Sequence, residues 1–273
     1  MPYSPSDYWR DLHRRDDLSA VGQSALPAAL NAWLYRTLAR NVGAAVRRLK
    51  LDRPAPRRVF DVGAGTGFWI SWWHERGAAI VDGCDLVPEA VERLNARFGT
   101  DRGVVRVADV TDPAGLGAAT YDLVSCQNVL LHVTEDAAFQ RALANVAALV
   151  APGGALLLTE PALLDPAYER PYDPDRHSRA RPLAAYRDPL EAAGLVLVAV
   201  EAATVLGNNP IEAGSRDAYR RYARWWGFVA RSAKEHPWRI GLLGRAILAL
   251  DPIAIRRGAA PSSKLIVLRR PAA

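Results

Sequence analysis

An alternation of short apolar strands and amphipathic helices, running from Arg58 to Glu160, most constrains the fold of this chain. The strand-like stretches lie at 59–62, 79–85, 104–107, 121–126 and 155–159. Segments between them have apolar residues at helical spacing. Repeated β-α units of this size require parallel strands with helices on both faces of the sheet. Two further apolar stretches, at 195–203 and 265–268, extend the pattern. We therefore expect an α/β fold with a doubly wound, mainly parallel, seven-stranded sheet.

The segments on either side of this alternation divide the chain into four parts. Apolar residues at helical spacing predict N-terminal helices at 6–15 and 25–49. Residues 161–181 are rich in Pro, Asp and Arg and indicate a long loop. The aromatic-rich stretch 206–261 predicts a helical lid. The expected division is an N-terminal helical cap at 1–55, the main domain at 56–204, a lid and substrate-binding insertion at 205–262, and the last strand of the sheet at 263–273.

Composition and charge narrow the functional class. The chain of 273 residues carries 35 Lys+Arg against 29 Asp+Glu, a formal charge of +6, and the arginines are spread along the sequence. A nucleic-acid binder would concentrate them on one face, so nucleic acid is disfavoured. Two cysteines make no disulfide framework, and the first residues lack the apolar core of a signal peptide. With no apolar run of about 18 residues, we expect a cytoplasmic protein.

A glycine-rich turn follows the first strand and opens a helix. It reads Asp61-Val62-Gly63-Ala64-Gly65-Thr66-Gly67. Glycine is required where the backbone approaches a ligand closely or takes positive φ. The dinucleotide fingerprint G-x-G-x-x-G would need glycine at position 68, which is Phe, and no Gly-Lys-Ser/Thr follows. NAD and ATP are therefore disfavoured.

An acid before a G-x-G-x-G turn resembles the first motif of class I S-adenosylmethionine (SAM) dependent methyltransferases, which have a Rossmann-like fold. The resemblance covers about residues 57–200 and the last strand, and it implies SAM as cofactor and S-adenosylhomocysteine as product. It includes Leu149-Val150-Ala151-Pro152-Gly153-Gly154, where the helix is expected to end before the fifth strand.

This resemblance implies a role for each matching residue. The turn at Asp61, Gly63, Ala64, Gly65 and Gly67 would hold the methionine part, with Asp61 attracting its ammonium group. The resemblance further implies a ribose site after the second strand, an adenine site after the third and a methyl-transfer site after the fourth. The residues at these three places are, in order, Asp85 with Leu86, Asp109 with Val110, and Gln127 with Asn128.

Candidate catalytic residues lie outside these motifs. His132 follows the fourth strand, on the side of the sheet where ligands bind, and is the first candidate base. It is also open to a structural or adenosine-facing role. His177, in the loop 172–177, is the second candidate, and an exposed loop histidine is its alternative. Other side chains could face the acceptor or the methionine carboxylate, namely Tyr172, Asn208, Asn209, Tyr8 and Arg14.

Missing motifs restrict the acceptor. No Asn/Asp-Pro-Pro-aromatic motif follows the fourth strand, which disfavours the family's adenine and glutamine amino-methyltransferases. Gln127 and Asn128 stand where metal-dependent catechol-type enzymes have acids, and no Cys/His cluster has zinc spacing. We therefore expect no metal.

The leading hypothesis is methyl transfer to an O or N atom of a small organic acceptor, apolar or aromatic, as in natural product biosynthesis. A second hypothesis is a lipid or quinone methyltransferase at a membrane surface, since 239–257 is strongly apolar between arginines. A third is a SAM-binding protein that does not methylate, and RNA methylation is a fourth. The acceptor and the oligomeric state stay open.

Overall fold

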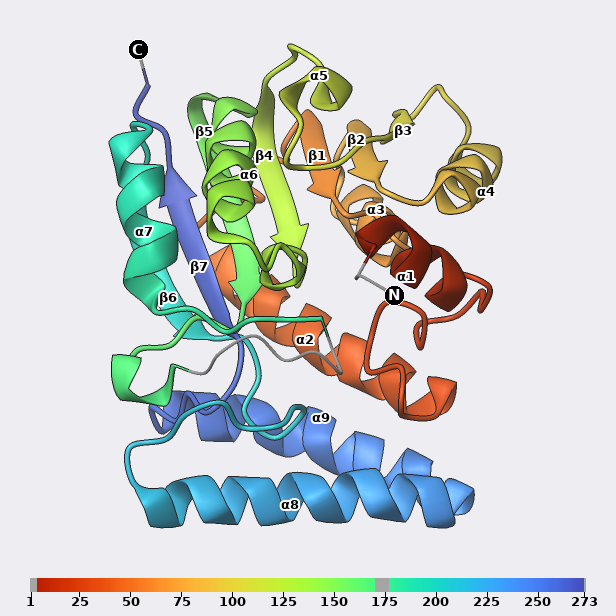
Figure 1. The fold of residues 1–273 in the computed structure, drawn as a ribbon, viewed down its shortest axis with the longest axis vertical. Helices are drawn as coiled ribbons and strands as arrows, with labels where there is room; N and C mark the ends of the chain where they lie inside the picture. Colours follow the sequence, from red (N-terminus) through yellow and green to blue (C-terminus); the bar gives the residue numbers. More distant parts are fainter. Residues whose placement is uncertain (1–3, 170–176, 273) are drawn as a thin grey trace.

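A single seven-stranded sheet forms the centre of the protein (Figure 1). The computed structural model describes residues 4–169 and 177–272. The strand order is β3-β2-β1-β4-β5-β7-β6, and only β7 runs antiparallel to its neighbours. The expected mainly parallel α/β sheet is thus confirmed. The strands are β1 (Arg58–Val62), β2 (Ile80–Asp85), β3 (Val105–Val107), β4 (Tyr121–Gln127), β5 (Val150–Glu160), β6 (Val196–Ala202) and β7 (Lys264–Arg269).

Helices lie on both faces of this sheet and in a separate outer layer. The helices are α1 (Pro5–Leu12), α2 (Ala28–Arg48), α3 (Phe68–His74), α4 (Pro88–Phe98), α5 (Pro113–Leu116), α6 (Asp136–Ala148), α7 (Leu183–Ala192), α8 (Arg216–Glu235) and α9 (Ile240–Arg256), with 3₁₀ turns η1 (Leu130–His132), η2 (Pro166–Tyr168) and η3 (Pro237–Arg239). Within the described ranges, none of the helices combines the length and apolarity that a membrane crossing needs.

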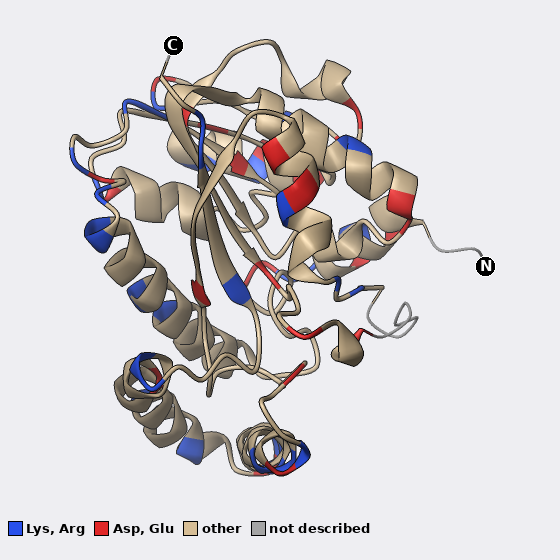
Figure 2. Cartoon of the chain, turned by 90° about the vertical axis from the view of Figure 1, so that its left-hand side faces the viewer, with Lys and Arg blue, Asp and Glu red and all other residues tan. Residues whose placement is uncertain are grey.

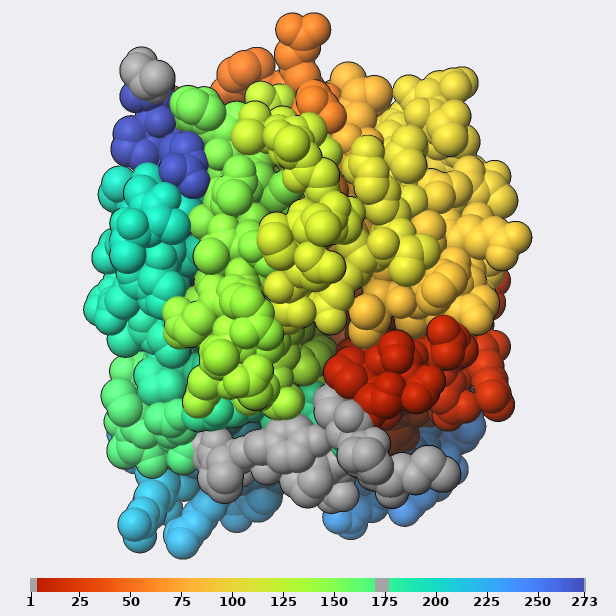
Figure 3. Space-filling model, turned by 45° about the horizontal axis from the view of Figure 1, so that its top comes forward, coloured from red at the N-terminus to blue at the C-terminus, as the bar shows by residue number. Residues whose placement is uncertain are grey.

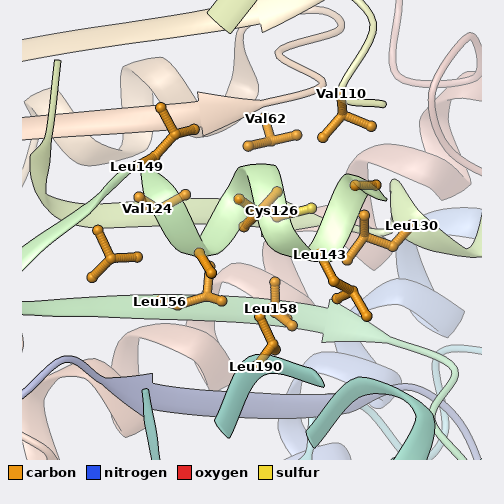
Figure 4. Close-up of a cluster of buried hydrophobic side chains, with 14 of the residues drawn as sticks. Val62, Val110, Val124, Cys126, Leu130, Leu143, Leu149, Leu156, Leu158 and Leu190 are labelled. Carbon is orange, nitrogen blue, oxygen red and sulfur yellow. The ribbon is translucent and has the colours of Figure 1, made fainter. Parts of the chain in front are cut away.

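Two apolar cores result from the alternation of side chains along the central strands. On β4, Leu123 faces the core beneath α2 and α3, whereas Val124 faces the core beneath α6 and α7. Figure 4 shows the second core, in which Cys126 of β4 lies close to Leu143 of α6. Both cysteines of the chain, Cys84 and Cys126, are buried free thiols.

The insertion between β6 and β7 packs on α2. The C-terminal half of α2 contributes Val42 to the core on the sheet. Its N-terminal half contributes Leu30 to a third apolar cluster, shared with Trp226 of α8 and Ile247 of α9. The α8–α9 pair therefore forms a layer on the far side of α2 from the sheet (Figure 1).

Some boundaries differ from the expectation: the two N-terminal helices span Pro5–Leu12 and Ala28–Arg48 instead of 6–15 and 25–49, and the fifth strand begins earlier than expected. The helix before the fifth strand ends at Ala148, and Pro152-Gly153-Gly154 lies inside β5. The register between β4 and β5 shifts there, because Tyr121 pairs with Val150 and Leu123 with Ala155. The glycines therefore form an irregularity within the strand, and Gly153 has a φ of 77°.

Core packing on α6 gives a first prediction. Leu143→Ala should lower the free energy of unfolding by about 2–5 kcal/mol, since Leu143 is fully buried and its loss leaves a cavity. The matched control is Leu164→Ala, because the Leu164 side chain is about half exposed. Urea unfolding followed by circular dichroism measures both variants. Equal unfolding midpoints would contradict this packing.

Candidate active site

A cavity of about 370 Å³ opens at the carboxyl ends of β1, β2 and β4. Its volume lies within the range of small-molecule sites, about 300–1,000 Å³. Sequence-predicted residues from four separate segments line it together. They are Gly63, Ala64, Gly65, Asp85, Leu86, Asp109, Val110, Gln127, Asn128 and His132.

The glycine turn after β1 is shaped for close approach. Gly63 and Gly65 have φ values of 67° and 56°, in the left-handed region that favours glycine. A Cβ atom on Gly63 would lie 2.5 Å from Cγ2 of Val129, and one on Gly65 would lie 2.7 Å from Cγ1 of Val21. The turn thus passes between two apolar side chains with no room for a side chain of its own. Gly67 is the N-cap residue of α3 and does not line the cavity.

Asp85 ends β2 and fixes the glycine turn. Its Oδ2 accepts a hydrogen bond from the Gly65 N–H at 2.8 Å, and its Oδ1 accepts one from the Val87 N–H at 2.9 Å. A carboxylate offers about four acceptor positions. Asp85 can therefore hold the turn and still accept hydroxyl donors from a ligand in the cavity.

Asp61 lies under the same turn, on β1, and is buried. Its Oδ2 has no hydrogen-bond partner. Burial raises the pKa of Asp61 to about 8, with a smaller contribution from the Asp85 charge and an opposing one from Ser125. Burial, and to a smaller degree the Asp61 charge, raises the pKa of Tyr35, which lines the cavity. A buried acid with an unused acceptor fits a ligand that brings a positive charge.

The chain turns sharply after β4, where Gln127 and Asn128 line the cavity. The Gln127 side chain accepts from the Thr159 hydroxyl and donates to the carbonyl oxygen of Leu157. Asn128 has a φ of 58°, which asparagine tolerates better than most residues. Its N–H donates to the carbonyl oxygen of Thr159 at 2.7 Å. Strand β5 therefore sets the position of both residues.

Two buried ionisable residues that the sequence analysis missed hold the next turn. Glu160, at the end of β5, accepts three consecutive backbone N–H groups, from Val129, Leu130 and Leu131, at 2.8–3.0 Å. Burial raises the pKa of Glu160 to about 8, whereas these three hydrogen bonds act to lower it. The sequence feature that could have identified Glu160 is its position as an acid at the end of an apolar strand.

The second missed residue is Arg181, which lies on the other side of this turn. It donates to the carbonyl oxygens of Val133 and Thr134 at 2.9 and 3.0 Å. Only the fold brings these residues together, so no local pattern predicts the contact.

His132 lies between these anchors and faces the cavity. Its Nδ1 is 2.9 Å from the carbonyl oxygen of His177, and its ring packs edge-on against Trp9 with centroids 4.7 Å apart. Because a carbonyl only accepts, Nδ1 carries the proton and Nε2 keeps its lone pair. Burial lowers the pKa of His132 to about 4. The ring is therefore a neutral acceptor at physiological pH.

Other predicted residues lie outside the cavity lining. The His177 ring packs against Tyr8, with centroids 4.8 Å apart, and its carbonyl group is what reaches His132. Arg14 is exposed and pairs with Asp11. The Asn208 side-chain oxygen accepts hydrogen bonds from the Gln23 side chain and from the backbone N–H of Asn209, and Tyr172 is outside the described residues.

The cover of the cavity comes from the N-terminal segment. Trp9 and His13 line it from α1 and the residue that follows, and Tyr35 lines it from α2. His13 is buried, and its Nδ1 has no hydrogen-bond partner. Figure 3 shows this segment packed against those that follow β2 to β4. No described residue of 205–262 lines the cavity, so the lid role of that insertion stays a prediction.

Metal ligands are not gathered in the part of the chain that the structure describes. No three His, Cys, Asp or Glu side chains there come close enough to share an ion.

A family model described as a methyltransferase domain matches residues 32–200, more than half of the chain. The chain belongs to this methyltransferase domain family. The match begins inside α2 and ends inside β6, so it includes the glycine turn, both acids that end β1 and β2, and the turn after β4.

Relatives and solved structures agree with this membership. The chain is 39% identical over 108 residues to a ubiquinone biosynthesis O-methyltransferase from Xanthomonas axonopodis pv. citri, covering 39% of this chain and 44% of that protein. The chain thus spans less than half the length of this relative.

Two solved structures have the same fold at low sequence identity. One is an O-methyltransferase of a Brevibacillus brevis multienzyme in complex with S-adenosylhomocysteine (TM-score 0.52, 16% identity, 79% of this chain, 67% of the other). The other is the [4+2]-cyclase SpnF (TM-score 0.52, 17% identity, 94% and 98%). The fold is that of the class I SAM-dependent methyltransferases, and its likeness to a cyclase means that the fold alone does not fix the reaction.

Asp85 gives a prediction on cofactor affinity. Asp85→Asn should weaken SAM binding by about 1.5–3 kcal/mol, because hydrogen bonds to a charged acceptor are lost. Asp101→Asn, on an exposed loop, removes the same charge as a control. Titration calorimetry measures both variants, and thermal melts check that they fold. Equal affinity in the two variants would show that the ribose does not contact Asp85.

Asp61 gives a prediction on pH. Its carboxyl is mainly neutral at pH 7, and a bound ammonium group favours the ionised form, so binding should release a proton. SAM affinity should then rise from pH 6 to about 7.5, below the range where a free α-amino group itself titrates, about 7.7–8.0. Calorimetry in buffers of different ionisation enthalpy counts the protons. The same release in Asp61→Asn would contradict the assignment.

Proposed function

We propose that this chain transfers the methyl group of SAM to an oxygen or nitrogen atom of a small apolar or aromatic acceptor in the cytoplasm, without a metal ion. The observation that carries the proposal is one cavity lined by the glycine turn, by Asp85 at the end of β2, by Asp109 after β3 and by His132, with Asp61 buried beneath the glycine turn. The family membership supports the same reaction class.

The residues around the cavity fit SAM. Gly63 and Gly65 leave room for close contact, Asp85 has acceptor positions for ribose hydroxyls, and Asp61 has an unused acceptor for the ammonium group. Asp109 and Val110 lie further along the same lining, where an adenine would be held. Bound there, SAM supplies a methyl group on a sulfonium, already activated for displacement.

His132 would then remove the acceptor proton. Its Nε2 would take the proton of the acceptor O–H or N–H, so that an electron pair on that atom could bond to the methyl carbon while the carbon–sulfur bond breaks and its electron pair stays on sulfur. The ring gains a positive charge, which the His177 carbonyl stabilises through the Nδ1–H bond. Glu160 and Arg181 keep the turn that carries the ring in place. The main contribution of the chain is alignment, which can lower a barrier by several kcal/mol.

The aromatic lining favours an apolar acceptor. Trp9, Tyr35, Phe68 and Trp69 contribute to the walls of the cavity. Such walls exclude water and leave few polar groups to select the acceptor. The absence of a metal in the proposal rests on Gln127 and Asn128, which are amides at the place where metal-dependent relatives use acids.

A lipid or quinone acceptor is the second candidate. It is favoured by the similarity to a ubiquinone biosynthesis O-methyltransferase over 108 residues. A SAM-binding protein that does not methylate is the third, since the fold is shared with a cyclase. Formation of S-adenosylhomocysteine with any acceptor would remove the third candidate.

Methyl-labelled SAM added to an extract of the source cells tests the proposal. We expect label in an extractable small organic compound, which can then be identified. Label in the lipid fraction would favour the second candidate, and label in RNA would overturn the proposal. SAM binding without label in any fraction would favour the third candidate.

His132→Ala should lower kcat by roughly 10²–10⁴, the usual contribution of a positioned acid or base. The Kd for SAM should change little, since Asp85 and the glycine turn stay intact. His236→Ala, at the end of α8 and outside the cavity lining, is the matched control. A raised Kd with unchanged kcat would mean that His132 serves cofactor binding instead of proton transfer.

A further inference from the structure

The positive charge of the chain is concentrated on the α8–α9 pair. Residues 216–257 carry ten Lys+Arg and three Asp+Glu, a net charge of +7, whereas the whole chain carries +6. All other residues together therefore have a net charge of −1. The arginines are spread along the chain, but outside this layer acidic residues balance them, and Figure 2 shows blue segments on the helices of this layer. One of the three acids, Asp251, is buried in hydrogen bonds with Asn41 and Val205.

The same layer exposes large apolar side chains. Among the described residues, five of the nine well-exposed large apolar side chains lie here. Trp238, in the turn between the helices, is 73% exposed, and Leu242 and Phe228 are 68% and 54% exposed. The other two are Leu250 and Ile253. A face with this much apolar surface is typical of an interaction site.

Basic and apolar groups alternate on this surface at helical spacing. On α8, Arg220, Arg224, Phe228 and Arg231 follow at intervals of three or four and line one open groove. In the turn, the Arg239 guanidinium lies over the Trp238 ring, 4.8 Å from its centroid. Such side chains place an apolar part and a charged end at different depths.

We propose that the outer face of α8, η3 and α9 docks on the surface of a membrane that contains anionic lipids. A bilayer surface provides a binding partner for both kinds of side chain, because its anionic headgroups attract the arginines and its acyl chains take up the apolar side chains. Nucleic acid would match the arginines and stack on aromatic rings, but it offers no partner for the aliphatic Leu242, Leu250 and Ile253. The pair lies on the bilayer, because no described helix crosses one.

The position of this face relates it to the cavity. In Figure 1 the arrowheads of β4 and β5 point to the end of the molecule where α2, α8 and α9 lie. Helix α2 connects the two regions, since its Tyr35 lines the cavity and its Leu30 packs against α8 and α9. Docking would therefore turn the sheet end that carries the cavity toward the bilayer, with α2 and the α8–α9 pair between them, and would favour a lipid-soluble acceptor. Only this last step rests on the proposed function.

Vesicle co-sedimentation, without SAM or acceptor, tests the docking. The protein should bind vesicles of mixed phosphatidylcholine and phosphatidylglycerol and not vesicles of phosphatidylcholine alone. The triple variant Arg220→Gln, Arg224→Gln, Arg231→Gln should bind the mixed vesicles roughly 100-fold more weakly, since each basic residue near such a surface contributes roughly fivefold. The control removes the same charge from exposed arginines elsewhere, as Arg57→Gln, Arg102→Gln, Arg141→Gln.

The apolar contribution is tested at high salt, where charge attraction is screened. Trp238→Ser with Leu242→Ser should then weaken binding by about tenfold or more, because apolar area no longer leaves water. The control is Val196→Ser with Val198→Ser, two exposed apolar residues on β6.

Three results would overturn the docking: no binding to the mixed vesicles, equal loss in variant and control, or retention on RNA in place of vesicles. Loss of methyl transfer alone would leave it standing, because binding is measured without the reaction.

Discussion

The site depends on two buried carboxyl groups that each accept hydrogen bonds from backbone N–H groups of a neighbouring turn. Asp85 holds the glycine turn after β1 through Gly65, and Glu160 holds the turn after β4 through three consecutive N–H groups. Both acids end a strand of the same sheet. The two turns are thus each tied to the end of a strand, and residues of both line the cavity.

Burial sets the charge state of this cavity. Asp61 and Glu160 each have a pKa raised to about 8, and that of His132 is lowered to about 4. All three shifts disfavour the charged form, as desolvation requires. These three groups therefore carry little charge in the free protein. A cationic ligand would restore the charge on Asp61, and His132 stays available as a proton acceptor.

Helix α2 connects the sheet, the cavity and the α8–α9 pair. It packs its C-terminal half on the sheet, contributes Tyr35 to the cavity and holds the α8–α9 pair through Leu30. The proposed membrane face and the proposed methyl-transfer site are thus attached to the same rigid element. An acceptor that partitions into lipid would meet both, which is consistent with the apolar lining of the cavity.

The sequence by itself determined the sheet, the glycine turn and the acids at the ends of β1 and β2, because strand alternation, helical spacing and positive-φ glycines are local constraints. It did not determine the bonds from Glu160 to the turn after β4, or from Arg181 to Val133, or the contact of Trp9 with His132. Those pairs are about 30, 48 and 123 residues apart. It also misplaced the end of α6, because pairing of β5 with β4 outweighed the local preference of Pro152-Gly153-Gly154. Only tertiary packing decides such contacts, since their stability comes from burial shared by distant segments.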